Sequence, residues 1–441
     1  MKVVSSGKVK VVAAMCAAAV AAGVVGALVV LRAPEGQVVP WPPAFRHSKV
    51  ATTMGGWHAT TRATVRLVFP HEGKWLVFRG NPDTCHFSRD GVTWTAVEAK
   101  EASRSHLIRG GDITTVYTVM RVEGPPKWVF DQYVVRGKLA DTAIRWENPV
   151  KLDTRASYYP DLQQTTDGYV TMTGRAVIRN EKDEPAGSEV LWKRTVRPDD
   201  ISAWEPDVRC IHHVGDHRSG DPDSWKKIGS TAHENLTVED GRSCVIAMMT
   251  SGGVGRLLAN LHDGERWGTH DIELATGMST WAGTDRRMCA VFDPKARTIH
   301  LAYVDGAGGL WYRSAKTPYA EGDWSTPVRL QPFKTFTTVL SLDTSRDPVH
   351  VYVLFGKTLF ENRGDLRSTY GELYLQRLDG ETWTEAVLVS EPGTAENWYP
   401  NMNGDVSRGI GVLYLKGAGR VQSGKPPLDI MFASTGAPRT D

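Results

Sequence analysis

The chain has 441 residues, of which 41% are hydrophobic and 23% are charged, so it is long and apolar enough to bury a large core. Lysine and arginine together number 52, against 50 aspartates and glutamates. This near balance gives no electrostatic reason to expect a nucleic-acid partner, and we exclude that class of function.

The N-terminal region differs in composition from the rest of the chain. Three lysines precede an unbroken apolar run over residues 11–31, and Arg32 follows it. The run predicts one hydrophobic N-terminal helix within residues 1–35 that serves as an export signal, because its 21 residues match the roughly 20 that span a bilayer. An uncleaved membrane anchor, a cleaved signal peptide and a lipoprotein are the alternatives. The charge asymmetry predicts that residues 36–441 lie outside the cytoplasm, anchored through the N-terminal segment or secreted.

A tryptophan recurs at the start of a short extended segment throughout the remaining chain. Successive copies from Trp94 onward are 52, 58, 63, 57 and 59 residues apart, and a step of 53 residues back from Trp94 reaches Trp41. Spacing of this order is typical of repeats that each hold four strands. The sequence therefore predicts a seven-bladed β-propeller over residues 36–441. The seven positions are Trp41, Trp94, Trp146, Trp204, Trp267, Trp324 and Trp383.

Pairs of β-rich stretches separate the tryptophans. TIHLAYV followed by GGLWYRSA, and PVHVYVLF followed by GELYLQRL, alternate apolar and polar residues and are bounded by glycine and aspartate. Period-two alternation with β-branched and aromatic residues predicts hairpins, and no useful helical periodicity follows the N-terminal run. The predicted class is all-β. A β-sandwich or a solenoid with tryptophans spaced by chance is the alternative.

The two ends of the repeat region are incomplete in complementary ways. Strand signals over residues 399–402, 409–415 and 428–434 are not followed by a tryptophan strand, whereas Trp41 has no strands before it. A propeller is closed when its last blade takes its outer strand from the N-terminus. We therefore expect the N-terminal strand to close the ring.

Residues 88–94, SRDGVTW, resemble the Asp-box of the sialidase-like, BNR-repeat superfamily of β-propellers. In such a turn Asp90 accepts hydrogen bonds from turn amides, Gly91 relaxes the backbone and Trp94 packs between strands. Degenerate copies occur as HDGERW at residues 262–267 and LDGETW at residues 378–383. The resemblance implies a carbohydrate-active propeller, since seven-bladed relatives include glycosidases and polysaccharide lyases.

Polar residues near the start of each predicted inner strand are the candidate site, because inner strands line the channel of a propeller. A glycoside hydrolase needs two carboxyl groups, which Asp161, Glu234 and Asp285 could supply. A lyase needs a base and a group that holds a carboxylate. The predicted catalytic residues are His233, Glu234, Asp161, Asp285, His106 and Tyr159. The predicted substrate-binding residues are Arg62, Arg109, Asn235, Arg286, Tyr399 and Asn401.

The expected activity is cleavage of a glycosidic bond in a polysaccharide, by hydrolysis or by elimination. A non-catalytic propeller that binds a glycan or a protein, and a structural scaffold in which these polar groups only brace the ring, are the alternatives. The four cysteines beyond the N-terminal run show neither C-x-x-C spacing nor clustered histidines, so no metal, no cofactor and no functional cysteine are expected.

Overall fold

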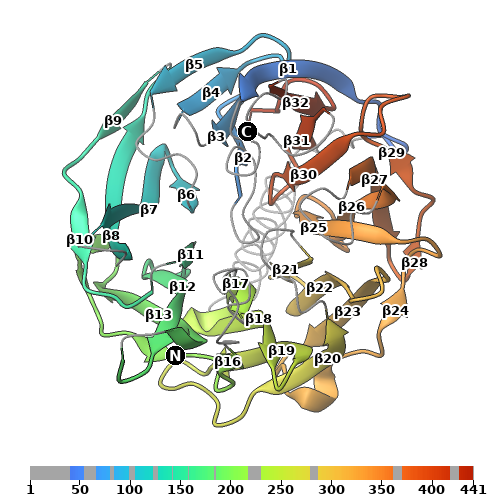
Figure 1. Ribbon diagram of the computed structural model, residues 1–441. Coiled ribbons are helices and arrows are strands. Elements are labelled where there is room, and N and C mark those ends of the chain that lie inside the picture. The colour runs from blue at the N-terminus through green and yellow to red at the C-terminus, as the bar shows by residue number, and fades with distance from the viewer. Residues whose placement is uncertain are drawn as a thin grey trace, which may run out of the picture. The chain divides into compact units, whose positions relative to one another are not determined.

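The computed structural model describes the chain except for residues 1–39, 54–65, 80–83, 99–104, 123–127, 142, 157, 183–184, 217–229, 279–286, 361–369, 418–426 and 441. Two compact units are distinguished, Met1–Trp41 and Pro42–Asp441. Only residues 40 and 41 of the first unit are described. The second unit is built of antiparallel sheets that follow one another around a centre (Figure 1).

Five of these sheets are separate blades of four to six strands. The first holds β2 (Val68–His71), β3 (Lys74–Arg79), β4 (Thr84–Ser88) and β5 (Thr95–Glu98). The second holds β6 (His106–Arg109), β7 (Asp112–Val122), β8 (Trp128–Leu139), β9 (Ile144–Trp146) and β10 (Val150–Leu152). The third holds β11 (Tyr158–Gln164), β12 (Val170–Arg179), β13 (Pro185–Arg197), β14 (Asp200–Trp204), β15 (Val208–Arg209) and β16 (Gly215–Asp216). The fourth holds β17 (Ser230–Thr237), β18 (Ser243–Ser251), β19 (Val254–His262) and β20 (Ile272–Met278), and the fifth holds β21 (Met288–Asp293), β22 (Thr298–Val304), β23 (Leu310–Lys316) and β24 (Val328–Arg329).

The other strands form one nine-stranded sheet. One stretch holds β25 (Thr335–Asp343), β26 (His350–Phe360), β27 (Tyr370–Asp379), β28 (Thr382–Trp383) and β29 (Val387–Leu388). The other holds β30 (Asn397–Met402), β31 (Gly411–Lys416), β32 (Leu428–Ser434) and β1 (Arg46–Thr53).

The prediction of seven blades is wrong as a description of these sheets, because five are separate and the rest are merged. The two stretches of the nine-stranded sheet join where Gly371 of β27 pairs with Asn397 of β30. The Asn397 side chain donates a hydrogen bond to the Gly371 carbonyl over 3.1 Å. The tryptophan spacing predicts how many repeated segments the sequence contains. It does not predict whether two segments are joined into one sheet by hydrogen bonds.

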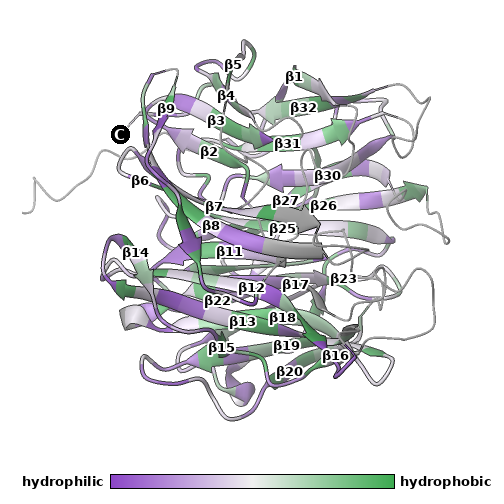
Figure 2. Ribbon diagram, turned by 60° about the vertical axis from the view of Figure 1, so that its left-hand side comes forward, coloured by the Kyte–Doolittle hydropathy of each residue, from purple (hydrophilic) through white to green (hydrophobic). Residues whose placement is uncertain are grey.

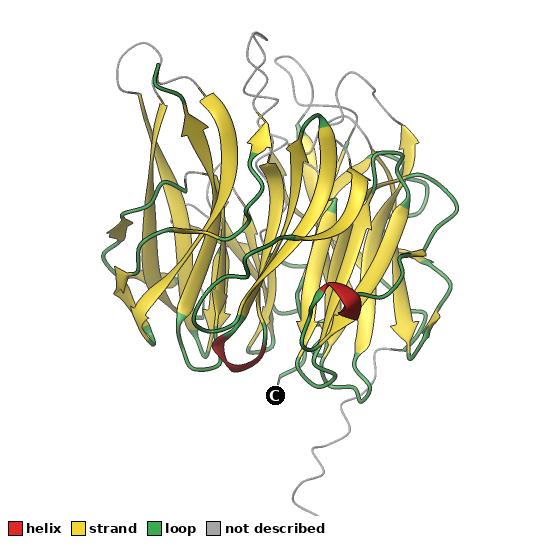
Figure 3. Cartoon of the chain, turned by 90° about the horizontal axis from the view of Figure 1, so that it is seen from below, coloured by secondary structure: helices red, strands yellow, loops and turns green. Residues whose placement is uncertain are grey.

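The predicted N-terminal helix is not found either. The run over residues 11–31 lies outside the described residues, and the described ones hold two 3-10 turns, Glu239–Gly241 and Glu321–Asp323, and no α-helix (Figure 3). Within this described part, no helix is long and apolar enough to cross a membrane. The all-β class is confirmed, and apolar residues concentrate along the strands (Figure 2).

Pairing between the two ends of the repeat region closes the ring. β1 runs antiparallel to β32 from the pair Arg46 with Ser434 to the pair Thr53 with Leu428. We expected the closing strand to begin at Trp41, and it begins five residues later, at Arg46.

The recurring tryptophans lie at the outer edge of the sheets and pack against the preceding one. The ring of Trp94 meets Phe432 edge to face at 4.9 Å, and that of Trp267 meets Trp192 at 5.5 Å. In each sequence repeat, one large aromatic ring fills the space between neighbouring sheets, which explains why tryptophan recurs at a regular spacing.

The turn that resembles an Asp-box has the predicted hydrogen bonds. Oδ1 of Asp90 accepts from the amides of Val92 and Thr93 at 2.8 and 2.7 Å, and Gly91 has a φ of +73°. These amides, with Thr93 first, hold the pKa of Asp90 well below its usual range. Trp94 donates its indole N–H to the Ser48 hydroxyl of β1, so the turn also anchors the closing strand.

Candidate functional site

The inner strands of the third and fourth blades, β11 and β17, lie side by side (Figure 1). His233 of β17 lies against the backbone of Tyr159. Two residues further along both strands, the amide of Asn235 donates to Oδ2 of Asp161 over 2.8 Å. The two strands therefore run in the same direction, and four predicted site residues come together near their starts.

Tyr159 and Tyr399 share an uncommon backbone conformation. Their φ values are +54° and +53°, each is followed by proline, and the pairing register of each strand shifts at this point. Such a β-bulge re-aims a side chain, and a left-handed tyrosine costs of the order of 1 kcal/mol. Strain of this kind often marks functional sites. Tyr159 is half-buried, whereas Tyr399 is buried.

The sequence did not point to Arg175, which comes from the second strand of the third blade, β12. Its guanidinium carbon lies 5.7 Å from the centre of the Tyr159 ring, within the range of a cation–π contact. The predicted site residues lie at the starts of inner strands, whereas Arg175 follows a glycine in the middle of the second strand of its blade. An arginine between mostly apolar residues, in the sequence MTGRAVI, was the available signal, since a buried charge is costly.

A group of polar side chains fills the space between β11, β12 and β17, and we name it the inter-blade cluster. All of its members except Tyr159 are at most 5% exposed. Nδ2 of Asn235 donates to the Thr171 hydroxyl over 3.0 Å. Within the described residues, Oδ1 of Asn235 and the Thr173 hydroxyl have no hydrogen-bond partner. The members are Tyr159, Asp161, Thr171, Thr173, Arg175, His233 and Asn235.

His233 is neutral at neutral pH. It is fully buried, and burial, assisted by the charge of Arg175, lowers its pKa to about 4. Neither ring nitrogen has a well-formed hydrogen bond within the described part of the chain. A neutral imidazole does not repel the neighbouring guanidinium, so both groups can share the inter-blade cluster.

Asp161 and Asn401 perform the same structural task in different sheets. Asp161 is 3% exposed and accepts the amide of Asn235 from the next blade. Asn401 is 2% exposed and accepts the amide of Leu67 through Oδ1 over 3.0 Å. Each follows a tyrosine–proline pair, so the repeated motif links one inner strand to the next.

Glu234 lies on the other side of β17 from His233 and Asn235, because side chains alternate along a strand. It is 6% exposed. Asp161 approaches β17 from the third blade, so the two carboxyl groups lie on opposite sides of this strand. Three other predicted residues lie outside the described residues: Arg62, Asp285 and Arg286.

His106 and Arg109 lie apart from the inter-blade cluster. His106 is buried, stacks on Phe78 with ring centres 4.2 Å apart, and is 2.8 Å from the Thr115 hydroxyl. Arg109 lies at the hairpin end of β6 and is 3.8 Å from Asp199. It lines a cavity of about 130 Å³ whose described lining includes no other predicted site residue.

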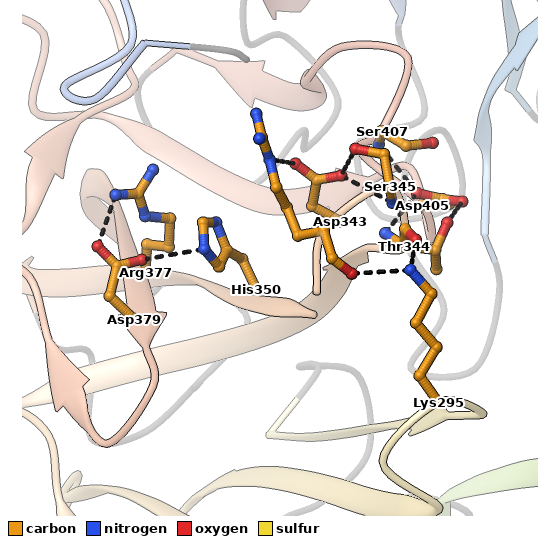
Figure 4. A network of polar contacts seen from close by, with 10 residues as sticks. Lys295, Asp343, Thr344, Ser345, His350, Arg377, Asp379, Asp405 and Ser407 are labelled. Atoms are coloured by element: carbon orange, nitrogen blue, oxygen red, sulfur yellow. Dashed lines mark hydrogen bonds and ion pairs between the residues drawn. The ribbon is translucent and has the colours of Figure 1, made fainter. Parts of the chain in front are cut away.

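Ion pairs and hydrogen bonds hold the hairpin ends of the inner strands (Figure 4). Nζ of Lys295 donates to the carbonyls of Thr344 and Arg346 at 2.7 and 2.8 Å. The Thr344 hydroxyl donates to Asp405 over 2.6 Å, and Asp343 accepts from Ser345. These contacts join the turns after β21, β25 and β30 and leave the opposite ends, where Tyr159 and Tyr399 lie, as the candidate site.

Arg66 is a second residue that the sequence analysis missed, since it selected Arg62 from the same stretch. Arg66 lies two residues before β2, and its guanidinium donates to the Leu340 carbonyl at 2.7 Å and the Met402 carbonyl at 3.2 Å. It also lies 3.4 Å from the Cys289 sulfur. Arg66 thus connects the first blade to the fifth blade and the nine-stranded sheet.

No group of three or more histidine, cysteine, aspartate or glutamate residues in the described part of the chain is arranged to hold a metal ion. The four described cysteines are buried, and none forms a disulfide bond within the described residues. Burial raises the pKa of Cys244 to about 12 and keeps its thiol protonated.

The chain is thus a β-propeller with a polar cluster at the start of two inner strands. No protein-family model matches the sequence, and no curated protein matches it. Similar solved structures include an ulvan lyase described as a new family of polysaccharide lyase, with 12% identity over 75% of this chain and 79% of that chain and a TM-score of 0.46. The BP39L lectin from Burkholderia pseudomallei has 12% identity over 81% and 94%, with a TM-score of 0.49. A sialidase of Trypanosoma rangeli has 11% identity over 84% and 53%, with a TM-score of 0.40.

Because these identities are low and the TM-scores are below 0.5, the likenesses carry no inference about the activity. The assignment to the β-propellers rests on the sheets themselves, and the predicted membership of the BNR-repeat superfamily is not matched by a family model.

Proposed function

We propose that this propeller cleaves a uronate-containing polysaccharide by β-elimination. The observation that carries the proposal is the pairing of Tyr159 with Arg175 at the start of β11. Elimination beside a carboxylate requires a base that removes a proton and cations that stabilise the resulting negative charge. Tyr159 is half-buried and is held in a strained conformation, which suits a group that must meet a substrate.

In this proposal the Tyr159 phenolate removes the proton beside the uronate carboxylate, the bond from the neighbouring ring carbon to the glycosidic oxygen breaks to leave a carbon–carbon double bond, and the departing oxygen takes a proton from Tyr159. Arg175 and His233 position Tyr159. Arg175 lies against the Tyr159 ring, and the neutral His233 packs behind it without adding a second positive charge. The substrate carboxylate would be held by Arg62 and Arg286, which are predicted to lie at the starts of two other inner strands. Both roles remain predictions.

Hydrolysis by Asp161 and Glu234 is less well supported. A glycosidase needs two carboxyl groups that flank one bond in a shared space. Asp161 is 3% exposed and accepts a backbone amide, and Glu234 lies on the opposite side of β17.

The experiment is a screen of the purified full chain against uronate polysaccharides and neutral ones, recording both new reducing ends and the ultraviolet absorbance of unsaturated products. We expect both signals with a uronate substrate. Reducing ends without unsaturation would replace elimination by hydrolysis, and would direct attention to Glu234 and Asp285.

Tyr159→Phe is expected to lower kcat at least 100-fold with little change in melting temperature, because it removes only the proposed base. The matched control is Tyr169→Phe in the same blade, where Arg194 lies 5.3 Å from the tyrosine ring but at the hairpin end of the inner strand. Equal kcat for the two variants would remove Tyr159 from the mechanism.

A non-catalytic glycan-binding propeller is the second candidate. It is favoured by the structural use of Asp161, Asn401 and His106, each of which is buried and bonded to its neighbours. Binding of a polysaccharide in affinity gels without product in the screen would establish this candidate.

We also propose that residues 36–441 act outside the cytoplasm, either secreted or attached to a membrane. The support is the lysine-flanked apolar run over residues 11–31 in the sequence. Protease added to intact producing cells should digest an attached body, whereas protection from the protease together with absence from the medium would contradict this location.

A further inference from the structure

An aromatic pair stands exposed at the junction inside the nine-stranded sheet. Phe360, at the end of β26, is 46% exposed and stacks on Tyr370, at the start of β27. Their ring centres are 4.9 Å apart and the planes differ by 15°. The Tyr370 ring therefore covers one face of the Phe360 ring.

An irregularity in the strand pairing sets the direction of these two side chains. Phe360 pairs with Tyr370 across the strands after a register shift between Thr358 and Phe360. A bulge of this kind turns a side chain away from the regular alternation. The stack holds the phenylalanine ring in place, so little side-chain entropy remains to be lost when a flat ligand covers it.

The pair lies next to the start of an inner strand. Gly371, which follows Tyr370, pairs with Asn397 at the first residue of β30. Tyr370 also packs against the core cluster that contains Trp398 and Tyr399. The exposed Phe360 thus stands on a tyrosine that packs against the same core cluster as Tyr399, one of the two strained tyrosines at the candidate-site end of the inner strands.

We propose that Phe360, supported by Tyr370, is a stacking subsite for a sugar ring of the polysaccharide, distant from the bond that is cleaved. The inference rests on the proposed glycan substrate. A pyranose ring presents a face of C–H groups, which packs on an aromatic face, while its hydroxyls stay hydrated at the rim. The neighbouring Leu359 is also exposed, at 48%, but Phe360 supplies the ring face. An extended glycan is the occupant that suits one such face, because each sugar unit needs only one platform.

The test is affinity gel electrophoresis of the full chain in gels containing polygalacturonate, alginate, hyaluronan, xylan or dextran. For the polysaccharide that retards the wild type, Phe360→Ala and Phe360→Leu should each weaken binding about tenfold, within the range for loss of an apolar contact in a binding site. Phe360→Trp should retain binding because it keeps a ring face. Val328→Ala, which removes methyl groups from a residue 49% exposed on β24, is the matched control.

The outcomes separate the subsite from the proposed function. Wild-type retardation that Phe360→Ala leaves unchanged would overturn the subsite and leave the glycan substrate standing. Loss of binding in Phe360→Ala but not in Phe360→Leu would overturn ring stacking in favour of simple apolar contact. Absence of retardation in every gel would overturn the glycan substrate itself, and the subsite with it.

Discussion

At the scale of single residues, neutral histidines buried in the sheets link stability to pH. Burial lowers the pKa of His233 and of His300 to about 4, well below the ordinary value of 6.5. Between these values the unfolded chain binds protons that the folded chain does not bind. Lowering the pH from 6.5 to 4 therefore favours unfolding.

The free energy of unfolding should fall by up to about 1.4 kcal/mol per pH unit for each such histidine in this window. Urea unfolding at pH 7, 6 and 5 measures the slope. His300→Gln should make it shallower, since glutamine does not titrate and can still bond to the Tyr312 hydroxyl, which lies 2.6 Å from Nδ1 of His300. An unchanged slope in this variant would show that His300 is protonated in the folded chain.

At the scale of elements, the turn at residues 88–94 was predictable because its hydrogen bonds are local. Asp90, Gly91 and Trp94 act within one loop, so their spacing in the sequence already specifies the geometry. The similar turn at residues 262–267 shows the same bonds, with Oδ1 of Asp263 accepting two amides at 2.9 Å. Strand pairs such as β22 with β23 were predictable for the same reason.

Asp90→Ala should cost about 1 to 2 kcal/mol at pH 7, the size of two lost bonds from amides to a carboxylate. Because the pKa of Asp90 is lowered on folding, its contribution is present above pH 3.8 and is lost as the pH falls through the folded value. The cost should thus shrink in acid. Val92→Ala, at a residue 47% exposed in the same turn, should change stability by less than about 0.5 kcal/mol.

Contacts between elements were less predictable. The sequence placed Tyr159, Asp161, His233 and Asn235 near the starts of inner strands, and the structure brings them together. The sequence could not show that the Asp161 carboxylate accepts a hydrogen bond from the backbone amide of Asn235. Nor could it show that the Arg175 guanidinium, on another strand, lies over the ring of Tyr159. Both facts depend on the distance between neighbouring blades, which no local pattern encodes.

At the scale of the whole molecule, Arg66 is one of the contacts that join sheets far apart in the chain. It donates to carbonyls of β25 and β30 from the residue before Leu67. The blade count failed at this scale as well, because the merging of two segments depends on the long-range pair of Gly371 with Asn397.

Arg66→Ala should destabilise the fold by about 2 to 4 kcal/mol, since it leaves two carbonyls without the charged donor. Arg66→Lys should recover only part of this loss, because a single ammonium cannot reproduce the guanidinium fork. Urea unfolding measures both, with Arg109→Ala as the surface control, expected to change stability by less than about 1 kcal/mol. Equal stability of Arg66→Ala and wild type would show that the crossing contact contributes nothing.

The pairing of β1 with β32 also has a consequence for the order in which the protein is made. The ribosome completes β1 hundreds of residues before its partner exists, so its edge stays open until synthesis is nearly finished. Such distant pairing slows folding and exposes an aggregation-prone strand in the meantime. Transfer of residues 40–53 to the end of the chain would let each strand meet its partner as it emerges, and would convert the slowest pairing into a local hairpin.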